Sequence, residues 1–325
     1  IDIHSHILPG LDDGASSERE SIRMLKLAAK QGVTAVIATP HYSPEYLSKS
    51  PDEIRNMCAS LEQKAREAIR PEFRIYSGQE ILYNQDVPEK LQRGEILTLA
   101  DSRYVLVEFM PWVPYSEIQR CVRTLTQYQY RPILAHVERY DVLRKKGRPE
   151  ELINMGALLQ MNYRRISGKW YEETTRWCRK MLKEGNVHFL GSDMHNMRTR
   201  KPELMEASHW MEKHLDNEYI KSISYANAEK ILANKIEKRI EMMENTREDE
   251  LEIDLKQIFY VLKEKILVIL AVGLLFGCIA CVATKFFMTP TYTSTSSMLL
   301  LINDKGFEST ADLQMGSQLT KDYSV

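Results

Sequence analysis

Residues 1–14 read IDIHSHILPGLDDG and set a pattern that other parts of the chain repeat. His4 and His6 follow a short apolar start, and at the end of a strand positions i and i+2 point the same way. Two imidazoles at that spacing can hold one metal ion from one side, and Asp12 and Asp13 follow in a turn-like segment. A single His-x-His pair is weak support, because isolated surface or core histidines are commoner than ligands. The metal hypothesis therefore depends on how the other strands end.

Short apolar segments alternate with amphipathic helical segments over most of the chain. Strands are expected at residues 1–3, 33–39, 73–77, 104–107, 133–135, 158–162 and 188–190. Helices are expected at residues 18–31, 51–69, 117–128, 170–183, 202–215 and 226–243. This βα alternation predicts an α/β fold whose parallel sheet of seven strands closes into a barrel.

Metal-binding residue types stand at the C-terminal ends of most of these strands. They are His4, His6, His41, Glu80, Glu108, His136, Asp193 and His195. In a βα barrel the strand ends share one mouth, where active sites are built. Scattered histidines and acids would have no reason to respect strand ends, so this recurrence predicts a metal site.

The residue types favour two or three divalent first-row ions, because imidazole suits Zn, Fe and Mn while carboxylates suit Mn and Mg. Adjacent ions lower the pKa of a bridging water, which makes hydroxide available near neutral pH. Arg139, with either Arg198 or Arg200, is placed to bind phosphate oxygens bidentately. Taken alone, each arginine is equally well explained as a solvated surface charge.

Composition narrows the function further. The net charge of −1 argues against nucleic acid as the main partner. The five cysteines are scattered, which fits a reducing cytosol better than a disulfide scaffold. None is followed six residues later by arginine, as the phosphate loop of cysteine-based phosphatases requires. Any phosphatase chemistry in this chain therefore uses another nucleophile.

A membrane segment is expected late in the chain. Residues 266–284 form a run of 19 residues without a charged side chain, and at about 1.5 Å per residue such a helix spans roughly the hydrocarbon core. With residues 286–288 the expected helix covers about 266–288. Three lysines lie before it and only Lys285 directly after it, which predicts a cytoplasmic N-terminal part and a short extracytoplasmic tail.

Six motifs, taken together, resemble a known family. They are DIHSHILPG at 2–10, DDG at 12–14, ATPH at 38–41, GQEI at 78–81, AHVERY at 135–140 and GSDMHN at 191–196. These look like the manganese-dependent tyrosine phosphatases of the PHP (polymerase and histidinol phosphatase) superfamily, which act in capsule and exopolysaccharide operons of Gram-positive bacteria. The resemblance covers about residues 1–240.

This resemblance implies a distorted seven-stranded barrel over residues 1–244 that holds three ions, with Mn expected and Fe or Zn also suited. One ion would be held by His4, His6, Glu80 and Asp193, a second by Glu80, Glu108 and His136, and the third by Asp13, His41 and His195. Arg139 and Arg200 would bind phosphate. Arg200, which follows Asp193 by seven residues, fits the family spacing better than Arg198.

The end of the chain resembles a second family. After a polar linker at 245–253, residues 254–325 are similar to the N-terminal part of Wzz-type chain-length determinants, which also modulate a tyrosine autokinase in these operons. The similarity rests on the membrane segment, PTY at 290–292 with the β-like run that follows, DLQ at 312–314 and QL at 318–319. The chain therefore resembles a fusion of the two families.

Together these features predict a single-pass cell-membrane protein with a cytoplasmic, metal-dependent protein-tyrosine phosphatase domain. Its expected substrate is the phosphotyrosine-bearing tail of a capsule-assembly autokinase, and other polysaccharide-assembly proteins are further expected partners. One alternative is a small-molecule phosphatase, such as a histidinol-phosphate phosphatase, which shares the metal site. The other is a regulator of chain length or of the kinase with little catalysis, against which the intact ligand set argues.

Overall fold

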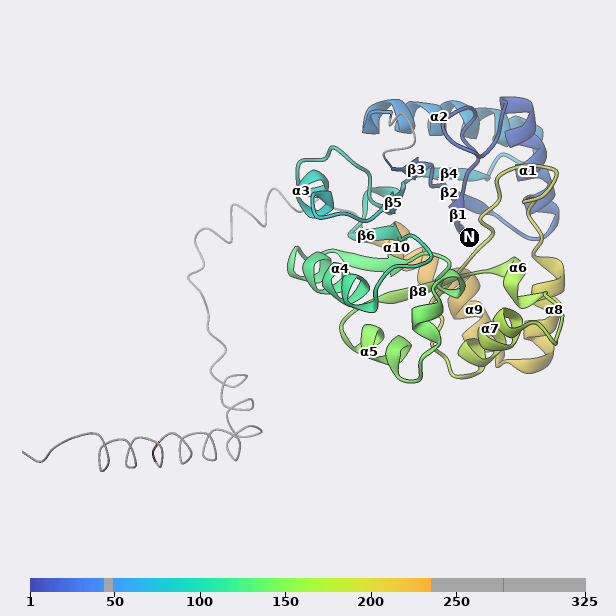
Figure 1. Ribbon diagram of the computed structural model, residues 1–325. Helices are drawn as coiled ribbons and strands as arrows, with labels where there is room; N and C mark the ends of the chain where they lie inside the picture. Colours follow the sequence, from blue (N-terminus) through green and yellow to red (C-terminus); the bar gives the residue numbers. More distant parts are fainter. Residues whose placement is uncertain (44–48, 235–276, 278–325) are drawn as a thin grey trace, which may run out of the picture. The chain divides into compact units, whose positions relative to one another are not determined.

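The computed structural model describes residues 1–43, 49–234 and 277, and Figure 1 shows their arrangement. The chain divides into two units, Ile1–Glu248 and Asp249–Val325, and the description below concerns the first. The expected linker at 245–253 and, except for Gly277, the expected membrane segment at 266–288 lie outside the described residues. Among the residues that are described, no helix has the length and apolar character needed to cross a membrane.

All seven expected strands are present, and two of them continue past a break as separate short strands. The strands are β1 (Asp2–Ser5), β2 (Ala35–Ala38), β3 (His41–Tyr42), β4 (Arg74–Ser77), β5 (Glu80–Leu82), β6 (Tyr104–Glu108), β7 (Arg131–Leu134), β8 (Leu158–Asn162) and β9 (Phe189–Gly191). The chain leaves β2 through Thr39 and Pro40 before β3, and proline has no N–H to donate to a ladder. Each short continuation carries a predicted ligand, His41 on β3 and Glu80 on β5.

Every strand pair in the described part is parallel. The strands form a three-stranded sheet of order β1-β2-β4 and a six-stranded sheet of order β3-β5-β6-β7-β8-β9. A parallel bridge between Ser5 and Met194 brings the chain after β9 beside β1, so the sheet curls. The predicted parallel α/β fold is confirmed, whereas the expected single barrel of seven strands is observed as two sheets, because the ladders break at the β2–β3 and β4–β5 steps.

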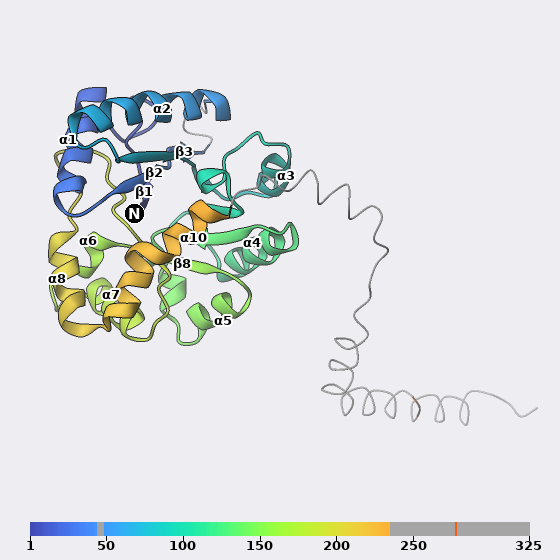
Figure 2. The ribbon, with the colours of Figure 1, turned by 180° about the vertical axis from the view of Figure 1, so that it is seen from behind.

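The helices surround this curled sheet, as the two opposite views in Figure 1 and Figure 2 show. They are α1 (Glu18–Lys30), α2 (Pro51–Ala68), α3 (Val87–Gln92), α4 (Tyr115–Gln127), α5 (Arg148–Asn154), α6 (Tyr163–Ile166), α7 (Glu173–Lys183), α8 (Met205–His214), α9 (Asn217–Lys221) and α10 (Asn227–Ala233). Short 3-10 segments are η1 (Leu99–Asp101), η2 (Val137–Arg139) and η3 (Asp141–Arg144), and η4 (Ser222–Ala226) is a π-helical segment. Of the helix expected at 226–243, the structure describes the part up to Ala233.

The start of α2 shows how local sequence fixes an element. Ser50 Oγ accepts a hydrogen bond from Glu53 N, and the Glu53 carboxylate accepts one from Ser50 N. Pro51 occupies the first turn, where its missing N–H has no partner to lose. The capping box therefore sets where α2 begins.

The strands divide the buried side chains into two clusters. On β6, Val105 and Val107 belong to the larger cluster beneath the surrounding helices, whereas Tyr104 and Leu106 belong to a smaller one on the other face. This alternation is the period of two expected of a strand that is buried on both faces. Ile231 of α10 joins the smaller cluster, and Figure 2 shows α10 on the side turned away in Figure 1. Glu108 follows Leu106 in the same alternation, at the end of β6.

We predict that Leu106→Ala lowers the free energy of unfolding by about 3 kcal/mol, because Leu106 is fully buried between strands and leaves a cavity. Urea unfolding of the full chain, followed by tryptophan fluorescence, measures the change. All four tryptophans lie within residues 1–234, so the signal reports this unit alone. Met205→Ala is the control, because Met205 is 61% exposed. Equal midpoints for the two variants would contradict the assigned core.

Candidate metal centre

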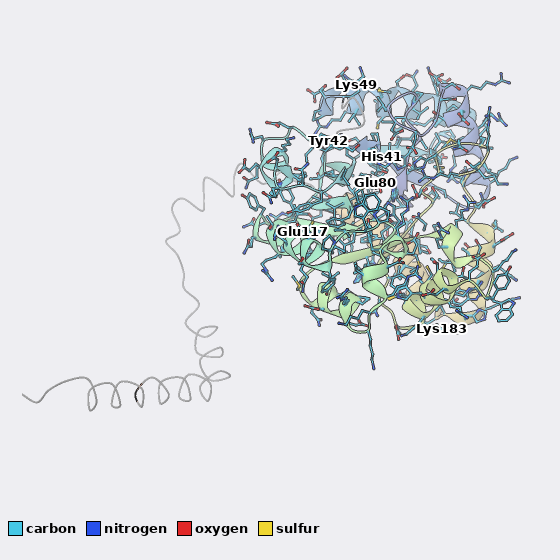
Figure 3. All side chains as sticks on the ribbon, in the orientation of Figure 1. His41, Tyr42, Lys49, Glu80, Glu117 and Lys183 are labelled. Carbon is cyan, nitrogen blue, oxygen red and sulfur yellow. The ribbon has the colours of Figure 1, made fainter. Side chains whose placement is uncertain are left out.

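The nine predicted ligand residues lie close together, on β1, β3, β5 and β6 and in the segments that follow β1, β7 and β9. Three groups have ligand atoms close enough to share an ion: His4, His6, Glu80 and Asp193; His6, Asp13, His41 and His195; and His41, Glu80 and Glu108. His136 joins them through Glu80, with 2.6 Å between His136 Nε2 and Glu80 Oε1. Figure 3 shows His41 and Glu80 near each other in the middle of the fold, away from Lys183 at its edge. Sequence reasoning thus placed these residues in one neighbourhood.

The first group is the one expected from the resemblance. His4 Nε2 and His6 Nε2 each lie 3.0 Å from Glu80 Oε2. Asp193 Oδ1 lies 3.5 Å from His4 Nε2 and 3.6 Å from His6 Nε2. All four residues are buried. Four ligand atoms at about 2.1 Å from one ion would be separated from each other by about 3 to 3.5 Å, which is close to the observed spacing.

The other two groups share His41, which differs from the expected division. His41 Nδ1 lies 3.3 Å from Glu80 and 3.0 Å from Glu108, while its Nε2 lies 3.4 Å from Asp13. His136 Nε2 is 3.5 Å from Glu108 Oε2. His41 therefore stands between the group expected around Glu80, Glu108 and His136 and the group expected around Asp13, His41 and His195.

His195 and His6 complete the group that contains Asp13 and His41. His195 Nε2 lies 3.3 Å from Asp13 Oδ1, and the His6 and His195 rings stack with centroids 3.8 Å apart. Asp13 is about half exposed, whereas both imidazoles are buried. This group is consequently the one most open to solvent.

Two buried atoms of the cluster lie 3.0 to 3.3 Å from oppositely charged groups but make no hydrogen bond of good geometry with a residue that the structure describes. They are Glu80 Oε2 and His195 Nε2. An unpaired buried polar atom is costly, and a cation among these ligands would remove that cost. The donor set of imidazoles and carboxylates suits Mn, Fe or Zn. The residues present therefore fit a divalent metal centre.

The pKa values of His6 and His41 also favour a metal centre at these residues. Burial alone would lower the pKa of His6, but its hydrogen bond to Asp12 and its contact with the Glu80 carboxylate raise it to about 9. Burial likewise opposes charge on His41, yet Asp13 and Glu108 raise its pKa to about 11. Without an ion, protons on His6 and His41 would balance the neighbouring carboxylates. Divalent ions would replace these protons, because metal ligation requires neutral imidazole.

Asp12 holds two of the histidine segments in place, a role that sequence reasoning did not assign to it. Asp12 Oδ2 accepts from His6 Nδ1 at 2.8 Å and from the His41 backbone N at 2.9 Å. The contact leaves His6 Nε2 free to face the cluster, as carboxylate–histidine pairs do at metal sites. Gly14 is required beside it, because a Cβ there would lie 2.4 Å from His6 O.

Strand β8 supplies a second support that was missed, because it was expected to carry no ligand. Gln160 Oε1 accepts from His4 Nδ1 at 3.1 Å and from His136 N at 2.7 Å. Gln160 Nε2 donates to Asn162 Oδ1, and Asn162 Nδ2 donates to Asp193 Oδ2 at 2.8 Å. His136 has a left-handed backbone with φ 32°, a conformation that needs such support. The sequence signal was the polar pair Gln160 and Asn162, two residues apart at the end of an apolar strand.

Two arginines flank Asp193 beside the cluster. Arg139 Nη2 donates to Asp193 Oδ2 at 2.9 Å, and Arg200 Nη2 donates to Asp193 Oδ1 at 2.8 Å. Arg200 Nη1 also reaches Asp13 Oδ2 at 3.3 Å. Both arginines line a cavity of about 450 Å³ that also includes Asp193. Of the two alternatives left by the sequence, Arg200 contacts the ligand residues, whereas Arg198 does not line this cavity.

Comparison with known proteins places the chain in a family. Residues 1–233 match the family described as capsular polysaccharide synthesis, CpsB/CapC. The chain belongs to this family. It is 33% identical over 242 residues to the tyrosine-protein phosphatase CpsB of Streptococcus pneumoniae, covering 73% of this chain and 99% of that protein. It is 31% identical to the tyrosine-protein phosphatase YwqE of Bacillus subtilis, covering 72% of this chain and 92% of that protein.

A solved structure and a second family agree with the motif resemblance. The fold matches a structure reported for YwqE of Bacillus subtilis and CpsB of Streptococcus pneumoniae, described as metal-dependent tyrosine phosphatases, with a TM-score of 0.66, 31% identity and coverage of 72% of this chain and 94% of that one. Residues 251–325 match the Wzz chain length determinant family. The chain is also 38% identical over 76 residues to the capsular polysaccharide biosynthesis protein CpsC of Streptococcus pneumoniae, a match that covers 22% of this chain and 33% of that protein. The resemblance to both families is thereby confirmed.

We predict that Gln160→Met lowers the affinity for Mn²⁺ about 10- to 100-fold, because it removes the acceptor that orients His4 and His136. Isothermal titration calorimetry on the full chain measures this affinity. Gln63→Met, at an exposed position of α2, is the matched control. An affinity equal to that of the control would show that β8 does not organise the ligands.

We predict that Mn²⁺ raises the melting temperature of the full chain by about 5 °C or more over the chelated protein, because an ion that binds only the folded state stabilises it. Tryptophan fluorescence during heating gives the shift. His195→Ala should lose most of it, whereas His209→Ala, at an exposed position of α8, should keep it. The absence of any shift in the unsubstituted protein would contradict a metal centre.

Proposed function

We propose that residues 1–233 form a metal-dependent protein-tyrosine phosphatase. The observation that supports it most strongly is the convergence of nine ligand residues beside two arginines that flank Asp193. CpsB and YwqE, the relatives of this part of the chain, are tyrosine-protein phosphatases, and the chain covers 99% and 92% of their lengths. Residues 1–244 are then the catalytic domain, 245–253 a linker and 254–325 a Wzz-like segment.

The ligand sets follow the clusters, with three ions proposed. His4, His6, Glu80 and Asp193 hold one. Glu80, Glu108 and His136 hold the second, and Asp13, His41 and His195 hold the third, with His41 close enough to serve either. Manganese is the proposed metal, since it accepts both imidazole and carboxylate. When bound, such ions supply a water-derived nucleophile near neutral pH and offset phosphate charge.

The chain's own residues bind and orient the phosphate. Arg139 and Arg200 approach Asp193 from two sides, and their guanidinium groups can hold two phosphate oxygens with the phosphorus turned toward the cluster. Asp12 and Gln160 keep His6 and His4 in the orientation that this geometry needs. A tyrosyl group leaves as a phenolate, whose conjugate acid has a pKa of about 10, so leaving-group protonation matters less than for an alkyl ester.

We further propose that the tail holds this domain at the cytoplasmic face of the cell membrane. The uncharged run at 266–284 and the lysines before it motivate the assignment. The Wzz match links this segment to chain-length determinants. The proposed substrate is the phosphotyrosine-bearing tail of a tyrosine autokinase of polysaccharide assembly, which a membrane tether would keep close. A regulator with little catalysis is the second candidate, favoured by the same match.

We predict Mn²⁺-dependent phosphate release from a phosphotyrosine peptide by the purified full chain, faster than release from histidinol phosphate. His136→Ala should lower kcat/KM at least about 100-fold, because His136 contacts Glu80 at the centre of the cluster. His209→Ala is the control.

Preference for histidinol phosphate would replace the protein-phosphatase assignment with the small-molecule one. Bound metal without release from either substrate would favour the regulator, and full activity in His136→Ala would contradict the proposed ligand set.

A further inference from the structure

The cavity beside the metal cluster extends beyond the two arginines that flank Asp193. Its lining also includes Arg164 and Arg165 from α6 and Lys201 from the segment after β9. α6 directly follows β8, so it lies at the same strand ends as the cluster (Figure 1). Five cationic side chains therefore surround one cavity, where Asp193 is the carboxylate among the described lining residues. The chain as a whole carries a net charge of −1, so this excess of positive charge is local.

The cations divide into two sets by what they contact. Arg139 and Arg200 pair with Asp193 at the inner end of the cavity. Arg165 is exposed, and its guanidinium makes no hydrogen bond or ion pair with any residue that the structure describes. Arg164 donates to the Thr199 backbone oxygen, which ties α6 to the segment after β9.

Lys201 completes the outer set. Its Nζ pairs with Glu203 at 3.1 Å, and both side chains are exposed. Neither this contact nor that of Arg164 involves a predicted metal ligand. The outer cations are therefore available to a different part of a substrate from the part held between Arg139 and Arg200.

A single phosphoryl group does not pair with all five cationic side chains of the cavity. Two guanidinium groups and the metal cluster can satisfy the oxygens of a single phosphoryl group. Clustered cations repel one another, and a second anion would relieve that repulsion. A cavity of about 450 Å³ also has room for more than the phosphoryl group.

We propose that Arg164, Arg165 and Lys201 form a subsite for a second anionic side chain close to the phosphotyrosine in the substrate. The enzyme would then favour phosphotyrosine in an acidic or multiply phosphorylated segment over phosphotyrosine in a neutral one. This inference rests on the proposed phosphatase function and specifies its substrate class. Arg165 is the residue that tests it most directly, because Arg164 also holds the Thr199 backbone.

The experiment compares Mn²⁺-loaded full chain on peptides that differ at one position beside the phosphotyrosine: alanine, glutamate or a second phosphotyrosine. Glutamate should raise kcat/KM about fivefold over alanine, mainly through KM, as expected of a partly exposed ion pair. High salt should reduce this preference. In Arg165→Ala the ratio of kcat/KM for the glutamate peptide to kcat/KM for the alanine peptide should fall toward one. Arg123→Ala, an exposed arginine of α4, should keep the ratio.

Binding is measured in parallel by fluorescence anisotropy, with a non-hydrolysable phosphonate in place of the phosphotyrosine phosphate. If the glutamate peptide binds more tightly than the alanine peptide, and Arg165→Ala removes the difference, the subsite is supported. This holds even if no peptide is hydrolysed, because a lack of hydrolysis would contradict only the proposed function. Hydrolysis of all peptides with the same ratio in Arg165→Ala as in the unsubstituted protein supports the function and overturns the subsite. Equal binding of the glutamate and alanine peptides also overturns it.

Discussion

The Glu80 carboxylate is the group on which the rest of the centre depends. It is buried, and His4, His6, His41 and His136 all approach it within 3.3 Å. Burial alone would raise the pKa of Glu80, but the neighbouring charges of His4 and His136 hold it well below the usual range. A buried anion of this kind is tolerated only where positive charge surrounds it. The curled parallel sheet supplies these histidines by bringing β1, β3 and β7 close to Glu80 on β5.

That these residues lie together was predictable, because each follows or lies on a strand of the same parallel sheet. Each predicted strand was found, and each except β8 ended within three residues of a histidine or acid that lies in the cluster. The exception is informative. Gln160 and Asn162 bind no proposed ion, so a search for ligand types passed over them, yet their amides hold His4 and Asp193. Supporting residues depend on three-dimensional contacts that no spacing rule encodes.

The division of the expected barrel into two sheets was not predictable for a similar reason. Hydrophobic alternation indicates that a strand exists, but it does not show where the hydrogen-bond ladder breaks. Pro40 between β2 and β3 was visible in the sequence, whereas its effect on the sheet depends on the pairing with β4 and β5. The same limit applies to α6, whose four residues are too few for a helical period to appear. That short helix nevertheless carries two of the five cations of the cavity.

The pairing of Arg139 and Arg200 with Asp193 has a consequence for the order of assembly. In the structure both guanidinium groups pair with a carboxylate that is itself a proposed ligand. An incoming phosphate would have to compete with Asp193 for them. An ion that draws the Asp193 charge to itself weakens this competition, so metal and phosphate each favour the binding of the other. The Asp193 carboxylate thus takes the place that the substrate phosphate would have between the two arginines. Metal binding at Asp193 would free these arginines to bind the phosphate.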